Sequence, residues 1–169
     1  GLCVPTSNEV AGRWHSLPEL KGFQAWTAKR PGGSMPDQLE RDLKLFAASK
    51  GIKLPRHVQH TGGDVEFLRK ALKTRRMVGM TYAGMDTFYG QQGIAHMVDG
   101  AHLDNKLGAI IDNNQPGSWR WMSDTQLINR WLGKQDNGKP IIVYDEFRRG
   151  FEVGGGWLVA WLMNPTPPI

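Results

Sequence analysis

The chain has 169 residues, of which 40% are hydrophobic and 22% are charged, a balance typical of one globular domain with a sizeable core. Its net charge of +5 is scattered rather than gathered with aromatic residues on one face, so we expect no specific nucleic-acid binding. No apolar run reaches the roughly 18 residues that cross a membrane, and a single cysteine excludes an internal disulfide and a zinc site built on paired cysteines. We therefore expect residues 1–169 to form one domain without a membrane segment.

The first half of the chain is predicted to be mainly helical. A proline in the first turn and apolar residues at helical spacing predict a helix over Cys3–Trp14, with Cys3 at its amino end. Residues 16–35 are rich in Pro, Gly and Ser and indicate a loop. Further helices are predicted over about residues 36–50 and 64–75, joined by a connector at 52–63.

The second half changes to the patterns typical of strands, interrupted by one short helix from about residue 123 to 132. Residues 104–106, Asp-Asn-Lys, are a turn signal and predict a hairpin. Helices first and strands second favour an α+β fold over an alternating parallel sheet. The predicted strands cover residues 77–82, 94–103, 107–112, 140–144 and 157–162.

Cys3 is the candidate nucleophile. A thiol attacks as the thiolate, and both the positive end of a helix and a neighbouring imidazolium lower the pKa of a thiol. The predicted helix supplies the first of these effects to Cys3. The alternative is that Cys3 is a small buried hydrophobic residue, the usual role of a lone cysteine.

The imidazolium must come from a histidine elsewhere in the chain. His15 lies too far along the same helix, His57 and His60 lie in a polar connector, and His102 lies close to the hairpin turn. His96 enters a strand directly after a flexible loop, so its ring can be held firmly beside a cleft. We therefore expect His96 to be the base.

The imidazole needs a third group that fixes its tautomer and its angle. The run Asp112-Asn113-Asn114 ends the partner strand of the predicted hairpin and comes opposite His96 when residues are counted from the turn. Any of the three side chains can orient the ring. The alternative is that they only form a turn, the commoner role of such residues.

Taken together, these segments resemble the papain-like cysteine peptidases, and in particular their bacteriocin-processing branch, which acts on double-glycine leaders. The run Cys3-Val4-Pro5-Thr6-Ser7 followed by Trp14 resembles the start of the central helix of that branch. Residues 67–72 and 77–80 resemble its next helix and first strand. Residues 95–98 resemble its histidine strand, and residues 110–113 resemble the strand that delivers the third catalytic residue.

The resemblance implies a papain-like fold, in which a helical N-terminal half, with the nucleophile at a helix N-terminus, packs on a C-terminal antiparallel sheet. It implies a catalytic set of Cys3, His96 and Asn113. Asn113 is preferred because papain-type members have a Trp six positions after the Asn, the spacing from Asn113 to Trp119. In the bacteriocin branch an Asp takes this role, and Asp112 can do so if the hairpin carries a bulge.

Members of the family also have a Gln about six residues before the Cys, whose amide helps to form the oxyanion hole. Because Cys3 is the third residue, we expect either that a segment upstream of Gly1 is missing or that the site lacks this donor. Gln91 or Gln92 can substitute for it, and the Gly84–Gly93 loop that contains them is a candidate wall of the substrate cleft.

The resemblance implies a cysteine peptidase that cleaves a peptide or protein substrate through a thioester intermediate, with no cofactor and no metal. Two alternatives stay open. One is a papain-fold acyltransferase or amidase that uses the same thiol site, and the other is a catalytically inactive papain-like binding module. The sequence leaves localisation and oligomeric state open.

Overall fold

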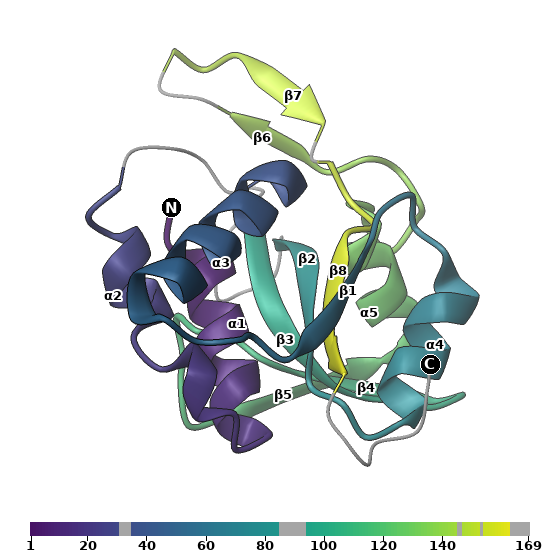
Figure 1. Cartoon of the computed structure of the whole chain (residues 1–169). Coiled ribbons are helices and arrows are strands. Elements are labelled where there is room, and N and C mark those ends of the chain that lie inside the picture. Colours follow the sequence, from purple (N-terminus) through teal and green to yellow (C-terminus); the bar gives the residue numbers. More distant parts are fainter. Residues whose placement is uncertain (31–34, 85–93, 145–146, 153, 163–169) are drawn as a thin grey trace.

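The computed structural model describes residues 1–30, 35–84, 94–144, 147–152 and 154–162, and this part of the chain is a mixed helix and sheet structure (Figure 1). The helices are α1 (Cys3–Trp14), the 3₁₀ helix η1 (Pro18–Leu20), α2 (Phe23–Thr27), α3 (Pro36–Lys50), α4 (Val65–Lys73) and α5 (Asp124–Trp131). The strands are β1 (Arg56–His60), β2 (Val78–Gly84), β3 (Ile94–Leu103), β4 (Leu107–Ile111), β5 (Trp119–Ser123), β6 (Ile142–Tyr144), β7 (Gly150–Glu152) and β8 (Leu158–Leu162).

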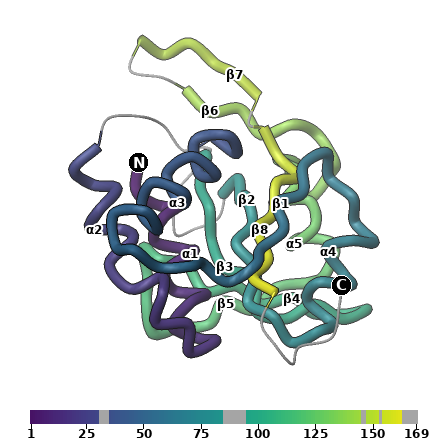
Figure 2. The backbone as a smooth tube through the Cα atoms, viewed as in Figure 1, coloured from purple at the N-terminus to yellow at the C-terminus, as the bar shows by residue number. Residues whose placement is uncertain are grey.

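Six strands form one sheet in the order β1-β8-β2-β3-β4-β5. Every neighbouring pair in this sheet is antiparallel. Strands β6 and β7 form a separate antiparallel hairpin, which projects from one end of the molecule (Figures 1 and 2). The structure therefore supports the α+β prediction at the level of its mixed elements and antiparallel sheet.

The sheet is covered by helices on both faces, and the alternation of side chains along its strands sorts them into two cores. Met97 and Val159 belong to the core that lies under α1, α2 and α3. Val98 and Leu158, their direct neighbours in sequence, belong to the core that lies under α4 and α5. No helix in the described residues combines the length and the apolar character needed to cross a membrane.

Most predicted elements are present, because their apolar periodicity is clear. The helix predicted over Cys3–Trp14 is α1, and the predicted helices and strands that correspond to α3, α4, α5, β2, β3, β4, β6 and β8 agree to within about two residues at their ends. The hairpin turn is also confirmed: the Asp104 carboxylate accepts hydrogen bonds from the backbone N–H groups of Lys106 and Leu107, at 2.7 Å each.

Other elements differ from the prediction. Residues 16–35, predicted as a loop, contain η1 and α2, and residues 52–63, predicted as a connector, contain β1. Strands β5 and β7 were not predicted. The expected arrangement of an N-terminal helical half on a C-terminal sheet changes in one respect, because β1 joins the sheet from the first half.

Strand β3 and its partner β4 carry a bulge. Asp99 pairs with Ile111 and Gly100 with Ile110, but on the turn side of the bulge His102 pairs with Ala109. One extra residue on β3 therefore shifts the register between the turn and the start of the strand. This shift changes which residue after β4 meets the side chain of His96.

Candidate active site

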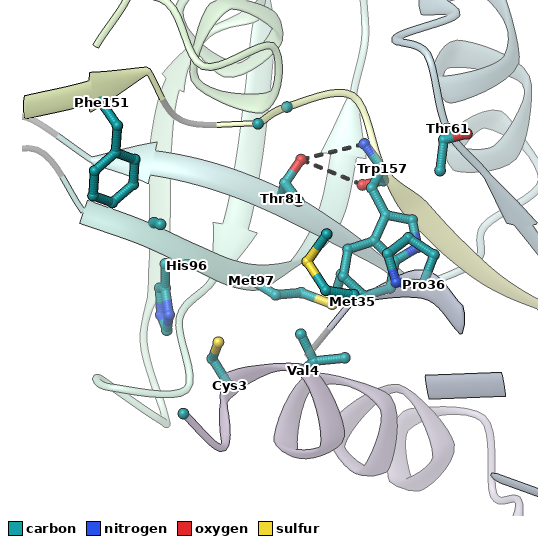
Figure 3. A pocket seen from close by; sticks show the side chains of 14 residues that line it. Cys3, Val4, Met35, Pro36, Thr61, Thr81, His96, Met97, Phe151 and Trp157 are labelled. Carbon is teal, nitrogen blue, oxygen red and sulfur yellow. Dashed lines mark hydrogen bonds between the residues drawn. The ribbon is translucent and has the colours of Figure 1, made fainter. Parts of the chain in front are cut away.

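An apolar cleft of about 480 Å³ opens between the start of α1, the start of α3 and the segment that links β7 to β8. Cys3 and His96 lie at one end of it, where the sulfur and the ring point toward one another, and Trp157 and Pro36 lie at the other end (Figure 3). None of its described lining residues is Asp, Glu, Lys or Arg. Cys3 and His96 thus line a cleft of low polarity, in which a molecule that enters can reach both the thiol and the imidazole.

Cys3 is the first residue of α1 and is half-buried. The first turn of α1 contains no acidic residue, and no side chain in the described part of the protein caps its amino end. The first backbone N–H groups of a helix lack partners within the helix, and the helix dipole places partial positive charge there. A negative charge on the sulfur of Cys3 is therefore favoured by its position alone.

His96 lies on β3 and is held by Asp112, which follows β4 directly. The Nε2–H group of His96 donates to Oδ1 of Asp112 at 2.8 Å, and both side chains are buried. Because Asp112 occupies Nε2, the interaction with the sulfur of Cys3 falls to the other nitrogen of the ring. Strands from one hairpin and the start of α1 thus bring together a thiol, an imidazole and a carboxylate.

The carboxylate of Asp112 has further partners. Its Oδ1 accepts the backbone N–H of Asn114 at 2.9 Å, and its Oδ2 lies 3.7 Å from the guanidinium of Arg120. A buried carboxylate is costly unless it is paired and hydrogen-bonded. These contacts keep Asp112 fixed on the ring of His96.

The surroundings move the pKa values of the thiol and the imidazole in opposite directions. Burial raises the pKa of Cys3, but the hydrogen bond and charge of His96, together with a hydrogen bond from the backbone of Met97, outweigh it and lower the pKa below its usual value. Burial lowers the pKa of His96, but the hydrogen bonds and charges of Asp112 and Cys3 raise it to about 9. This pattern favours a thiolate–imidazolium pair at neutral pH.

Asn113, the preferred third residue from the sequence, does not take the position beside the ring. Its side-chain Nδ2 group contacts the hydroxyl of Ser7 at 2.9 Å, the carbonyl of Met97 at 3.0 Å and the carbonyl of Cys3 at 3.3 Å. Strand β4 ends at Ile111, and Asn113 lies in a turn in which the N–H of Gln115 donates to the carbonyl of Asp112 at 2.9 Å. In this turn Asp112 meets His96, whereas the side chain of Asn113 contacts α1. The bulge in the hairpin, the condition under which Asp112 was considered, is present.

Ser7 and Met97 were not singled out from the sequence. Ser7 lies one turn after Cys3 on α1, and its hydroxyl donates to the carbonyl of Met97 at 3.1 Å. The spacing of Cys3 and Ser7 was a signal that could have found Ser7, because residues four apart lie on the same helix face. The role of Met97 depends on its backbone, which no side-chain pattern reports.

Two further expectations fall outside the described residues. Gln91 and Gln92, the candidate donors to an oxyanion hole, lie in the range 85–93, and so does most of the loop considered as a cleft wall. For metal binding, the described residues contain no group of three or more His, Cys, Asp or Glu side chains that could hold an ion.

The arrangement can deliver a thiolate to a molecule in the cleft and can return a proton from His96 to a group that leaves it. Comparisons of the chain with protein-family models, with curated proteins and with solved structures gave no match, so the case for this site rests on the geometry of its own residues.

Proposed function

We propose that the chain is a cysteine peptidase of papain-like fold, in which Cys3 is the nucleophile, His96 the acid and base, and Asp112 the residue that orients His96. The observation that carries the proposal is the position of His96, between the thiol of Cys3 and the buried carboxylate of Asp112. A nucleophile, a base within reach and a third group that orients the base are the components of covalent catalysis by a triad.

In the first half of the reaction, the thiolate of Cys3 attacks the carbonyl carbon of a peptide bond in the cleft. The tetrahedral intermediate collapses to a thioester, and the imidazolium of His96 gives its proton to the leaving amine. The backbone N–H of Cys3 is a candidate donor to the oxyanion, because the first N–H groups of a helix have no partner within it.

In the second half, His96 is neutral and accepts a proton from water, which attacks the thioester. The bond between sulfur and carbonyl carbon breaks, the carboxylic acid product leaves, and the proton returns the site to its resting ion pair. Asp112 stays ionised and holds Nε2–H of His96 throughout, which keeps the other ring nitrogen aimed at the reacting atoms.

The first test uses the fact that Cys3 is the sole cysteine, so alkylation by iodoacetamide reports on it alone. At pH 6 a free thiol is mostly protonated, and we expect Cys3 to react at least about tenfold faster than glutathione. A rate equal to that of glutathione would contradict the proposal and favour an inactive binding module.

The second test is hydrolysis of a peptide library by the wild type and by Cys3→Ala, followed by mass spectrometry. We expect new amino and carboxyl termini with the wild type only. Addition of hydroxylamine or glycine amide separates the two enzymatic alternatives: a product that carries the added amine in place of the free carboxylate would indicate an acyltransferase.

A further inference from the structure

Three further residues contact one another beside the proposed catalytic set, and each follows one of its members in the sequence. Ser7 follows Cys3 by one turn, Met97 follows His96, and Asn113 follows Asp112. The Ser7 hydroxyl donates to the Met97 carbonyl at 3.1 Å, and Nδ2 of Asn113 reaches the same carbonyl at 3.0 Å.

The orientation of the Asn113 amide follows from its neighbours. The Met97 and Cys3 carbonyl oxygens can only accept hydrogen bonds, so the side-chain atom that faces both must be the nitrogen. The hydroxyl of Ser7 completes the set, because it accepts from Asn113 at 2.9 Å while it donates to Met97. Asn113 thus connects the start of α1 with β3 and with the segment after β4.

Sheet geometry explains why the backbone of Met97 is available for these contacts. Met97 pairs with Thr81 on β2, but the N–H of Thr81 donates to the carbonyl of Trp157 on the other side. In such a non-hydrogen-bonded antiparallel pair, the N–H and C=O of Met97 both point away from β2. Strand β4 has already ended there, because its last residue, Ile111, pairs with Asp99.

The two backbone groups of Met97 consequently serve two purposes on the same side of β3. Its carbonyl is held by Ser7 and Asn113, and its N–H points to the same side of β3, where a hydrogen bond from the Met97 backbone lowers the pKa of Cys3. A hydrogen bond to a charged group stabilises the charged form. Any shift of this part of β3 relative to α1 would therefore weaken the N–H contact to the sulfur.

We infer that Ser7 and Asn113 are positioning residues, which clamp the backbone of Met97 to the first turns of α1 and thereby keep its N–H on the sulfur of Cys3. This inference rests on the proposed function, because it concerns the reactivity of the same thiol. It gives neighbouring residues separate tasks: Asp112 orients the imidazole, and Asn113 orients the backbone that contacts the nucleophile.

The inference is tested with Ser7→Ala, Asn113→Ala and the double variant, with Asn105→Ala as the matched control, since Asn105 is exposed at the turn of the same hairpin. The measurement is the pH profile of Cys3 alkylation by iodoacetamide. We expect each single variant to react about three- to tenfold more slowly at pH 6, the usual effect of one lost hydrogen bond. The midpoint of the profile should move to higher pH in both, and Asn105→Ala should match the wild type.

The double variant sharpens the test. Because both residues hold one carbonyl, we expect its loss of rate to be smaller than the product of the two single losses. We expect Ser7→Ala to keep α1 folded, because alanine is a better helix former than serine, so a slower reaction of this variant does not come from an unfolded helix. A purely structural role would lower the melting temperature of the variants but leave the midpoint of the alkylation profile unchanged.

The outcomes separate the inference from the proposed function. If wild-type Cys3 reacts no faster than glutathione, the proposed function fails and the inference fails with it. If the wild type reacts rapidly and Ser7→Ala and Asn113→Ala keep both its rate and its midpoint, the proposed function stands and the inference is overturned.

Discussion

Two histidine–aspartate pairs lie at opposite ends of the β3–β4 hairpin, and they have nearly the same geometry. His96 meets Asp112 at 2.8 Å, and His102 meets Asp104 at 2.7 Å. The side chains of the first pair are 5% and 0% exposed, whereas those of the second are 41% and 50% exposed. Contact distance alone therefore does not distinguish the candidate site from an ordinary surface pair.

The two pairs differ in their burial and in the thiol of Cys3, which lies beside only the His96–Asp112 pair. The His96–Asp112 pair lies beside the thiol of Cys3, and the hydrogen bonds and charges of Asp112 and Cys3 raise the pKa of His96 to about 9. In the exposed pair, hydrogen bonds from His102 and from the turn backbone lower the pKa of Asp104 to about 2, but the sole thiol of the chain lies beside the other pair. Exposed ion pairs contribute little to stability because water screens them. The hairpin thus supplies its own matched control.

Removal of the two histidines should give the largest contrast. We expect His96→Ala to lower kcat/KM for peptide hydrolysis by about a thousandfold, within the range for loss of a general acid–base residue. His102→Ala should leave kcat/KM within about twofold of the wild type, because its partner is exposed. Equal losses in the two variants would show that the buried pair has no special role.

Substitution of Asp112 should lower kcat/KM more than substitution of Asp104, by a smaller factor than the one that separates the two histidine variants. Asp112→Asn keeps the shape of the side chain but removes the charge that holds Nε2–H of His96, and we expect roughly a hundredfold loss of kcat/KM through a misplaced tautomer. Asp104→Asn keeps an oxygen that can accept from the turn backbone, so activity should change by less than about twofold. Full activity of Asp112→Asn would contradict the assigned role of Asp112.

A third aspartate of the hairpin, Asp99, differs from Asp112 and Asp104 in its effect on stability. Asp99 is fully buried, and its carboxyl oxygens have no hydrogen-bond partner among the described residues, so burial raises its pKa well above the usual value. The folded state then retains the proton while the unfolded state loses it near pH 3.8. Stability from this group is fully present below that pH and is lost as the pH rises toward the folded pKa.

We therefore expect Asp99→Asn, which cannot ionise, to be more stable than the wild type at pH 7, by about 1 kcal/mol or more. The difference should shrink as the pH falls toward 4. Urea unfolding at several pH values measures it. A difference that does not vary with pH would mean that Asp99 has a partner that keeps it ionised in the folded protein.

The sequence alone was sufficient for the elements with a strong local pattern. Helix α1 was predicted with its observed bounds, because the proline in its first turn and its apolar residues mark both ends. Strand β1 was missed because its residues, Arg-His-Val-Gln-His, are mostly polar. It is a strand because it pairs with β8 and contacts α3, including the hydrogen bond between His57 and Glu40. Such distant partners cannot be read from a local pattern.

In the candidate site, too, the sequence indicates the residues that have a local signal and does not indicate those that depend on distant partners. Cys3 and His96 could be selected from a helix terminus and a strand entry, both local features. The choice between Asp112 and Asn113 depended on one extra residue in β3, because a shift of one residue in the register changes which residue after β4 comes opposite His96. The contacts of Ser7 and Asn113 with the Met97 carbonyl depend on a backbone group, which the sequence does not distinguish from any other.

The effect of His96 on the ionisation of Cys3 is measured by the pH profile of Cys3 alkylation in the wild type and in His96→Ala. We expect wild-type Cys3 to react with a midpoint below that of a free thiol, because His96 and the Met97 backbone stabilise the thiolate. In His96→Ala the midpoint should rise to that of a free thiol or above it, because burial then opposes ionisation. The same midpoint in both proteins would show that His96 does not promote the ionisation of Cys3.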